Sequence, residues 1–342
     1  MNAIVRTIEV HLEVPFAISR SVRTSRKIVL VELAEGVRTA RGEATADPYF
    51  GETPETVEGE VRAALDLLGD DPPDLDGACA RIDARFPHGG AASCALDVLA
   101  HDRAAQTAGV TLREFVGLGE GEAPPTSYTI GLAEPGVMAE RAAAAAAKGY
   151  KVLKVKLARR DCAVILSAIR ERYAGPIRVD PNGAWTADEA PAHIAGIVPF
   201  GIEFVEQPVD PRDVAALRRV RERSELPIVA DEAAVRSADL RELATACDGV
   251  NVKLQKCGGI AEARRMIALA HELGLRVMLG CRAAETSVGI AAAAHLAPAV
   301  EWADLDGNLL IVDDPFAAVP VEDGRFAFSD RPGLGVVPRA AR

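Results

Sequence analysis

The spacing of apolar residues differs between two parts of the chain. Over residues 1–42 apolar and polar positions alternate, a pattern typical of half-buried strands. The segments 53–69 and 94–110 have helical spacing instead, and Thr53 is in place to cap the first of them. Strands followed by helices predict an α+β domain, which we assign to residues 1–122.

From Thr126 onward, short apolar strands alternate with helical segments in a regular repeat. Repeated βα units of this kind predict a parallel sheet, and eight of them in one domain favour closure into a barrel. We therefore predict an α/β barrel of eight strands and seven helices over residues 123–309. The expected strand segments are 127–132, 152–158, 177–182, 202–208, 227–233, 249–257, 276–281 and 301–307.

Composition and charge exclude several classes of function. The 342 residues contain 39 Lys and Arg against 50 Asp and Glu, a net charge of −11, and no basic stripe that would bind nucleic acid. No apolar run reaches the ~20 residues of a membrane span, and the N-terminus lacks the apolar core of a signal peptide. Six scattered cysteines without a C-x-x-C pair fit a reducing compartment. We expect a cytoplasmic homo-oligomer that binds a small molecule, without nucleic-acid or membrane partners.

One charged residue closes each of the central predicted strands. The steps between these residues are 24, 26, 25 and 22 positions, about the length of one βα unit. Because the carboxyl ends of the strands form the active-site face of such barrels, these side chains should meet at one end. The residues are Lys156, Asp180, Glu206, Asp231 and Lys253.

The three carboxylates in this series come from consecutive strands and predict a metal site. Asp180, Glu206 and Asp231 would repel one another in a small site unless a cation neutralised them. An oxygen-only ligand set favours Mg²⁺ over zinc. The alternative is that the three carboxylates pair with neighbouring Lys and Arg side chains.

Lysines stand on both sides of the carboxylates in strand order. Lys154 and Lys156 are two residues apart on the second strand and so share a face, and Lys253 ends the sixth strand, across the barrel. A second cation near an ammonium group lowers its pKa, which is one way in which a lysine becomes a base near neutral pH. Solvated surface lysines are the simpler interpretation of a K-x-K motif taken alone.

Taken together, the motifs of the chain resemble a known family. The segments LKVKL, RVDPNGAW, FVEQP, VADEA, VNVKLQKCGG and DLDG are similar to those of the muconate-lactonizing subgroup of the enolase superfamily, and most similar to its dipeptide epimerases, such as L-Ala-D/L-Glu epimerase. The resemblance implies a modified (β/α)7β TIM barrel with an N-terminal capping domain. It also implies that residues 310–342 return to complete this cap.

The resemblance implies a reaction and a role for each residue. One Mg²⁺ per subunit, on Asp180, Glu206 and Asp231, would bind the substrate carboxylate and stabilise an enediolate after loss of the α-proton. Lys156 and Lys253 would be the acid/base pair on opposite faces of the α-carbon. Lys154 would modulate them, and Asn182 would support the metal and carboxylate environment.

Further residues correspond to substrate contacts in the dipeptide epimerases. Asp304 and Asp306, at the end of the eighth strand, match the D-x-D pair that holds the α-ammonium of the dipeptide, although a turn ending in Gly307 would have the same sequence. Thr129, at the end of the first strand, is a further candidate. Arg20, in a loop of the cap, matches the position that binds the side-chain carboxylate of a glutamate.

One segment departs from the pattern of the family. The end of the seventh strand reads GCRAAET, in which Arg282 replaces a methionine and one residue is inserted before Glu285. Arg282 would either bind an acidic group of the substrate or pair with Glu285 or with the D-L-D carboxylates.

Several reactions are compatible with these motifs. Two opposed lysines favour epimerisation or racemisation, so a dipeptide epimerase is the first hypothesis and an N-acylamino acid racemase the second. A cycloisomerase, an o-succinylbenzoate synthase or a dehydratase of the same superfamily would keep both lysines but would have no ammonium group for Asp304 and Asp306 to bind. A non-catalytic barrel would have no need of all five metal and lysine positions.

Overall fold

A three-stranded antiparallel sheet forms the N-terminal part of the molecule. The computed structural model describes residues 3–69, 74–119, 121–158, 161–317 and 319–339. The central strand is buried along Ile28–Val31, where the chain is continuously apolar, and Gly36 makes the tight turn to the third strand with φ 61°. The strands are β1 (Ala3–Ile18), β2 (Ser21–Glu35) and β3 (Arg38–Ala44).

Four helices complete this capping region. Thr53 caps the first by accepting a hydrogen bond from the amide of Thr56, as predicted. The second helix was not predicted from the sequence; its buried residues are Ala78 and Ile82. The helices are α1 (Pro54–Ala63), α2 (Leu75–Arg85), α3 (Ala91–Ala108) and α4 (Leu112–Phe115).

Helix α3 joins the two halves of the molecule because it is buried on nearly every side. Cys94 and Val98 belong to the large core that lies between the barrel strands and their helices, whereas Leu96 and Leu99 pack in the core of the cap. The apolar spacing of segment 94–110 predicted this helix, which starts three residues earlier than expected.

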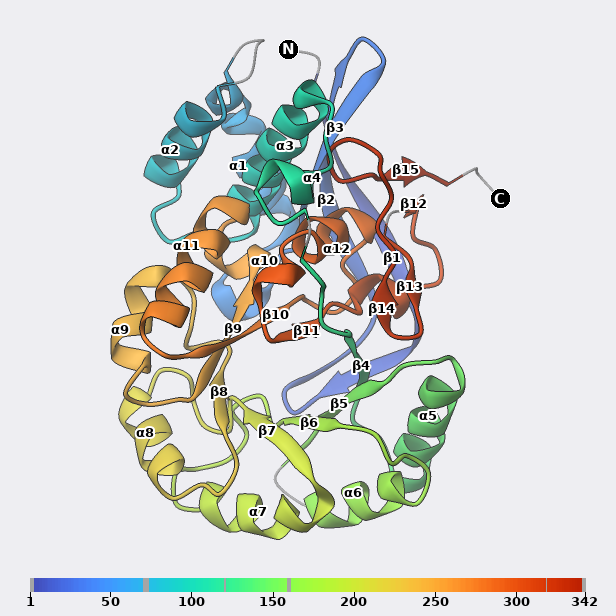
Figure 1. The fold of residues 1–342 in the computed structure, drawn as a ribbon, viewed down its shortest axis with the longest axis vertical. Helices are drawn as coiled ribbons and strands as arrows, with labels where there is room; N and C mark the ends of the chain where they lie inside the picture. Colours follow the sequence, from blue (N-terminus) through green and yellow to red (C-terminus); the bar gives the residue numbers. More distant parts are fainter. Residues whose placement is uncertain (1–2, 70–73, 120, 159–160, 318, 340–342) are drawn as a thin grey trace.

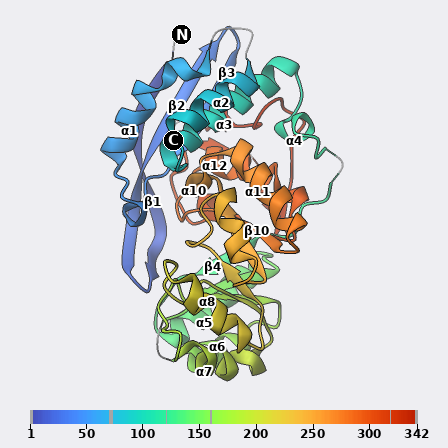
Figure 2. The same cartoon turned by 90° about the vertical axis from the view of Figure 1, so that its left-hand side faces the viewer.

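Eight parallel strands form a nearly closed barrel below the cap (Figures 1 and 2). They pair in chain order, and a parallel bridge between Thr126 and Ala303 connects the first strand to the last. The predicted α/β barrel is thus confirmed. The strands are β4 (Ser127–Ile130), β5 (Val152–Lys156), β6 (Ile177–Asp180), β7 (Ile202–Glu206), β8 (Ile228–Ala230), β9 (Gly249–Lys253), β10 (Arg276–Gly280) and β11 (Trp302–Asp304).

Helical segments fill each of the seven connections between these strands, which agrees with the (β/α)7β pattern. None of the helices in the described ranges is long and apolar enough to cross a bilayer. The helices are α5 (Pro135–Ala147), α6 (Cys162–Arg170), α7 (Ala190–Ile197), α8 (Val214–Glu222), α9 (Leu240–Leu243), α10 (Leu254–Cys257), α11 (Ile260–Glu272) and α12 (Ser287–Ala294).

After the barrel the chain returns to the cap. The amide of Leu112 donates to the carbonyl of Gly333 at 2.8 Å, and the amide of Leu334 donates to the Asp102 carboxylate at 2.8 Å. The C-terminal segment therefore completes the cap, as predicted. Its short strands are β12 (Phe316–Ala317), β13 (Val321–Glu322), β14 (Arg325–Phe326) and β15 (Val337–Pro338).

The β1–β2 hairpin reaches from the cap to the carboxyl end of the barrel (Figure 1). The amide of Glu13 donates to the carbonyl of Leu310, and the amide of Leu132, after β4, donates to the carbonyl of Ala17. The hairpin turn thereby lies over the barrel mouth, where the predicted functional residues are.

Candidate active site

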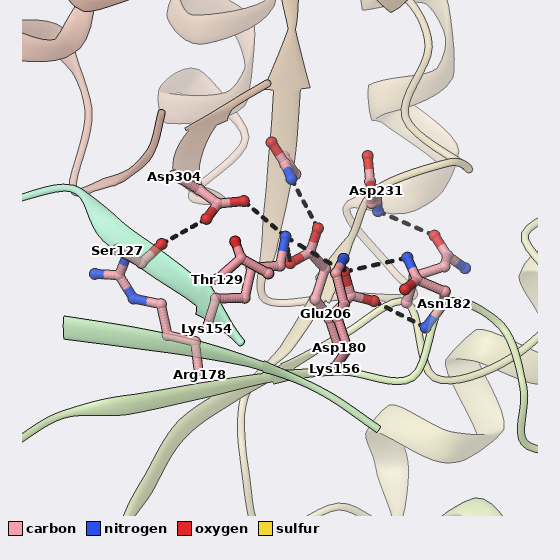
Figure 3. Close-up of polar contacts among 12 residues, drawn as sticks. Ser127, Thr129, Lys154, Lys156, Arg178, Asp180, Asn182, Glu206, Asp231 and Asp304 are labelled. Carbon is pink, nitrogen blue, oxygen red and sulfur yellow. Dashed lines mark hydrogen bonds and ion pairs between the residues drawn. The ribbon is translucent and has the colours of Figure 1, made fainter. Parts of the chain in front are cut away.

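Three buried carboxylates lie together at the carboxyl ends of neighbouring strands (Figure 3). Asp180 and Glu206 are the last residues of β6 and β7, and Asp231 directly follows β8. One oxygen of each lies within 4.8 Å of one oxygen of each of the others, and all three side chains are fully buried or nearly so. The spacing of one βα unit between them has the predicted effect of bringing them to one point.

The electrostatics of this cluster suit a divalent cation. Burial, together with the charges of Asp180 and Asp231, raises the pKa of Glu206 to about 8. Burial also opposes ionisation of Asp180 and Asp231, but neighbouring lysines outweigh it and lower both pKa values. Only carboxylate oxygens are offered, and a hard cation such as Mg²⁺ prefers these donors. The residues present therefore fit the metal that the sequence implies.

Lys156 and Lys253 approach the cluster from opposite sides. The Nζ of Lys156, at the end of β5, lies 2.6 Å from Oδ2 of Asp180, and the Nζ of Lys253, at the end of β9, lies 2.7 Å from Oδ2 of Asp231. Burial opposes the charge of Lys253, but Asp231 and Glu206 raise its pKa above the ordinary value. The space above the carboxylates is therefore bounded by one amine on each side.

Lys154 lies deeper and contacts three carboxylates. Its Nζ is 2.7 Å from Oδ2 of Asp304, 2.6 Å from Oε2 of Glu206 and 3.3 Å from Oδ2 of Asp180. The contact with Glu206 is an ion pair without hydrogen-bond geometry. Although burial opposes the charge, these carboxylates raise the pKa of Lys154 well above its ordinary value, so it is a permanent cation of the site.

Asn182 orients Asp180 through two hydrogen bonds. Its backbone amide and its side-chain Nδ2 donate to the two oxygens of Asp180, at 2.8 and 3.2 Å. The residue has φ 51°, a conformation that asparagine tolerates better than most side chains. Its Oδ1 is buried beside the carboxylates and has no hydrogen-bond partner within the described part of the chain.

Four residues that the sequence analysis did not identify position the same cluster. Lys256 donates to Oδ1 of Asp231 at 2.7 Å and Asn251 donates to Oε1 of Glu206 at 2.7 Å. The Gln207 side chain accepts the amide of Asp231, and Ser127 donates to Asp304. Lys256 lies in the one-turn helix α10, outside the strand-end spacing, so periodicity gave no signal for it.

Asp304, the last residue of β11, and Asp306, two residues later, line the same cavity but have different partners. Asp304 accepts from Lys154 and Ser127, whereas Asp306 accepts from the backbone amide of Thr129 at 2.6 Å. Burial, with the charge of Asp304, raises the pKa of Asp306 to about 6. Asp306 thus has more capacity left for an ammonium group than Asp304 has. Thr129 also lines the cavity.

The cap contributes Arg20 to the mouth of the site. Its guanidinium is 2.6 Å from Oε1 of Glu232, donates to the carbonyl of Asn182 and lies 4.6 Å from the ring centre of Tyr49. Arg20 therefore lies over the ends of β6 and β8. Glu232, which the sequence analysis did not identify, already provides it with a carboxylate.

Among the residues described, the side chain of Arg282 pairs with the cap and not with Asp304 or Asp306. Its side chain pairs with Glu52 of the cap at 2.8 Å and donates to the carbonyl of Thr45. Glu285 accepts the backbone amide of Arg282. The barrel loop after β10 is therefore tied to the cap, a contact across 230 positions that neither sequence alternative included.

A cavity lies between the barrel and the cap. It includes about 750 Å³ of empty space when the part open to solvent is counted. Lys154, Lys156, Lys253, Asp231, Asn182, Asp304, Asp306, Thr129, Arg20 and Arg282 all line it. Of the predicted site residues, only Asp180 and Glu206 are not among those that line it; both are fully buried at the strand ends.

Comparisons with known proteins agree with this arrangement. Residues 1–117 match the mandelate racemase/muconate lactonizing enzyme N-terminal domain, and residues 137–342 match the enolase C-terminal domain-like family. An L-Ala-D/L-Glu epimerase of Bacteroides thetaiotaomicron is 38% identical over 96% of this chain and 86% of its own length.

Solved structures give the same result. A substrate-liganded complex of the L-Ala-D/L-Glu epimerase from Bacillus subtilis superposes with a TM-score of 0.93 at 28% identity, over 100% of this chain and 99% of that one. The dipeptide epimerase from Methylococcus capsulatus, in complex with Mg and the dipeptide L-Arg-D-Lys, has a TM-score of 0.88 at 33% identity over 98% and 99%. From its two domains and its similarity over nearly the whole length, this chain belongs to the enolase superfamily.

Proposed function

We propose that this enzyme is a Mg²⁺-dependent dipeptide epimerase that inverts the α-carbon next to the free carboxylate of its substrate. The observation that supports this most directly is the pair Lys156 and Lys253, which stand on opposite sides of three converging carboxylates. Inversion needs a proton donor and a proton acceptor on opposite faces of one carbon, and two amines placed in this way provide both.

Asp180, Glu206 and Asp231 would hold one Mg²⁺ in each subunit. When bound, the ion supplies positive charge at the carboxylate of the substrate, where negative charge develops as the α-proton leaves. Burial and the charges of Asp180 and Asp231 raise the pKa of Glu206, which supports this assignment, and so do the magnesium complexes of similar proteins.

The lysines transfer the proton. In one direction Lys156 takes the α-proton and Lys253 returns a proton to the opposite face; in the other direction the roles exchange. Each amine lies against an aspartate that we assign to the metal. With Asp180 and Asp231 holding the ion, the two amines would face the α-carbon, one as the base and the other as the acid. Lys154 remains charged and stabilises the anionic intermediate.

The α-ammonium of the dipeptide would bind at the opposite end of the cavity. Asp306 provides the carboxylate for it, supported by Asp304 and by the Thr129 backbone. This site distinguishes a dipeptide from an N-acylamino acid, which has no ammonium group. Arg20 would close the mouth on the side chain of the epimerised residue.

The decisive experiment is α-proton exchange in D₂O, followed by NMR, over a dipeptide library with added Mg²⁺. We expect exchange and inversion at the residue with the free carboxylate. Turnover of N-acetylated amino acids in preference to dipeptides would instead identify an N-acylamino acid racemase. Elimination or cyclisation products without inversion would favour a lyase or cycloisomerase.

A further inference from the structure

The arginines of the cap form two groups over different parts of the barrel mouth. Arg20 contacts Asn182 and Glu232, after β6 and β8, near the lysine pair. Arg26 instead donates to the carbonyl of Ala283, in the loop after β10, at 2.9 Å. Arg23 lies beside it, because both contact the carboxylate of Asp47 at 3.6 Å.

The second group lies next to the proposed ammonium site. Gly280, at the end of β10, is in register with Asp304 of β11, and the Sγ of Cys281 is 3.9 Å from Oδ1 of Asp306. Arg282 follows in the same loop. A dipeptide with its ammonium on Asp306 therefore has its first residue beside Arg23, Arg26 and Arg282, and its second residue on the side of Arg20.

These three guanidinium groups are incompletely paired. Arg26 and Arg282 are more than nine-tenths buried, yet Nε of Arg26 and Nη2 of Arg282 have no hydrogen-bond partner among the residues described. The contacts of Arg23 and Arg26 with Asp47 are too long for hydrogen bonds. Buried donors without acceptors are rare, and a water, an ion or a bound group can satisfy them.

Positive charge is also in excess at this point. Within the described ranges, the three arginines have two carboxylates at ion-pair distance, Asp47 and Glu52. One of the three positive charges is therefore not balanced by an ion pair. Burial raises the pKa of nearby Glu285. Burial therefore disfavours the negative charge that would balance the arginines. Burial and the charges of Arg23 and Arg282 lower the pKa of Arg26 to about 10, although the charge of Asp47 opposes this change. An additional anion near Arg26 would therefore stabilise its charged form.

We infer that Arg23, Arg26 and Arg282 bind the side-chain carboxylate of an acidic first residue, so that the preferred substrates are dipeptides with Glu or Asp at the amino-terminal position. All three arginines line the cavity that contains the lysine pair and Asp306. The inference rests on the proposed epimerase function. It concerns the residue that is not epimerised, and so differs from the assignment of Arg20 to the second residue.

The test compares substrates that differ only in this carboxylate. L-Glu-L-Ala and L-Gln-L-Ala have nearly the same shape, and deuterium incorporation at the α-carbon of alanine gives kcat/KM for both. We expect a ratio of about ten to a hundred in favour of L-Glu-L-Ala, the factor that one charge-assisted hydrogen bond provides. L-Ala-L-Glu and L-Ala-L-Gln, measured in parallel, report on the second position.

Substitutions test whether the arginines cause the difference in kcat/KM between L-Glu-L-Ala and L-Gln-L-Ala. Arg282→Met removes a buried guanidinium, and Arg23→Gln removes a side chain that is about one-third exposed and whose loss the fold tolerates more easily. Each should reduce the Glu/Gln ratio at the first position at least fivefold. Arg6→Gln is the matched control, because it removes a cation from the same sheet far from the cavity, and it should keep the wild-type ratio.

The outcomes separate the two proposals. Equal use of L-Glu-L-Ala and L-Gln-L-Ala, or a ratio that neither Arg23→Gln nor Arg282→Met changes, overturns the acidic-residue inference and leaves the epimerase proposal intact. Absence of α-proton exchange with every dipeptide overturns the epimerase proposal and this inference with it.

Discussion

The floor and the roof of the active-site cavity hold their charged side chains in different ways. The floor consists of side chains at the strand ends: Lys154, Lys156, Asp180, Glu206, Asp231 and Lys253. Asp180 and Glu206 are completely buried, and each lysine has a carboxylate oxygen at 2.6 or 2.7 Å. The roof consists of Arg20, Arg23 and Arg26 with the loop 45–52. Its Arg20 and Arg23 side chains are about one-third exposed, and the contacts with Asp47 are 3.6 Å long.

This difference separates the chemistry from the choice of substrate. Strand register fixes the floor. Lys156 and Asp180 are register partners on neighbouring strands, so their contact does not depend on the cap. The roof belongs to a hairpin and a loop, which change more easily without disturbing the core. We expect changes in the floor to abolish the reaction and changes in the roof to redirect it.

Removal of the metal should have the largest effect, because it leaves the three floor carboxylates without their cation. Exhaustive chelation should abolish α-proton exchange with every dipeptide, and added Mg²⁺ should restore it. The measurement is the exchange rate in D₂O before chelation, after chelation and after re-addition. An unchanged rate in metal-free enzyme would refute the assignment of Asp180, Glu206 and Asp231.

Loss of one lysine should be nearly as severe. Lys156→Ala and Lys253→Ala should each reduce epimerisation by about a hundredfold to ten-thousandfold, since each removes one of the two proton-transfer groups. Each variant should still exchange the α-proton of one antipode only, which chirally pure substrates in D₂O will reveal. If either variant interconverts both antipodes at the wild-type rate, a single base is sufficient and the two-lysine mechanism is wrong.

An intermediate effect is expected where floor and roof meet. Asp306→Asn should lower kcat/KM for a dipeptide about ten- to a hundredfold, because a charge-assisted hydrogen bond to the ammonium is worth ~1.5–3 kcal/mol. The N-acetylated analogue has no ammonium and should be spared. Equal losses for both substrates would make Asp306 structural. Asp304→Asn is less selective, because Asp304 also holds Lys154.

The repeat of the chain explains why the floor could be predicted from the sequence. Each βα unit places one strand-end residue at the same height, so a spacing of about 25 residues identified Asp180, Glu206 and Asp231 without any contact being known. The barrel order followed from the same repeat. Resemblance to a family then supplied the roles of the lysines, which spacing alone left open.

The roof and the supporting residues could not be predicted in this way, because their partners are distant in the sequence. Arg282 pairs with Glu52 across 230 positions and Arg20 with Glu232 across 212. No periodicity relates a hairpin of the cap to a barrel loop. Asn251 and Lys256 were missed for a related reason: their partners Glu206 and Asp231 became apparent only once the strands were placed side by side.

The smallest effect on activity is expected at the junction that holds the C-terminal segment against the barrel. His295, after α12, is buried, and its Nε2 lies 3.3 Å from the carbonyl of Leu334, to which it donates. Burial, with a contribution from Arg113, lowers the pKa of His295 to about 4 from an ordinary value of 6.5. Between these two pH values the unfolded chain binds a proton that the folded protein excludes, so stability falls as the pH decreases from about 6.5 to 4.

His295→Gln should remove this dependence, because glutamine keeps a donor for Leu334 but does not titrate. Between pH 6.5 and pH 4 the free energy of unfolding of the wild type should fall by about 3 kcal/mol more than that of the variant. Each unit of pKa shift corresponds to about 1.36 kcal/mol. The difference in Tm between the two proteins across this range measures it. At pH 7.5 both should have the same kcat/KM, since His295 does not line the cavity. A variant with altered kcat/KM at pH 7.5 would show that the junction also sets the position of the roof, and the separation of floor and roof would then be incomplete.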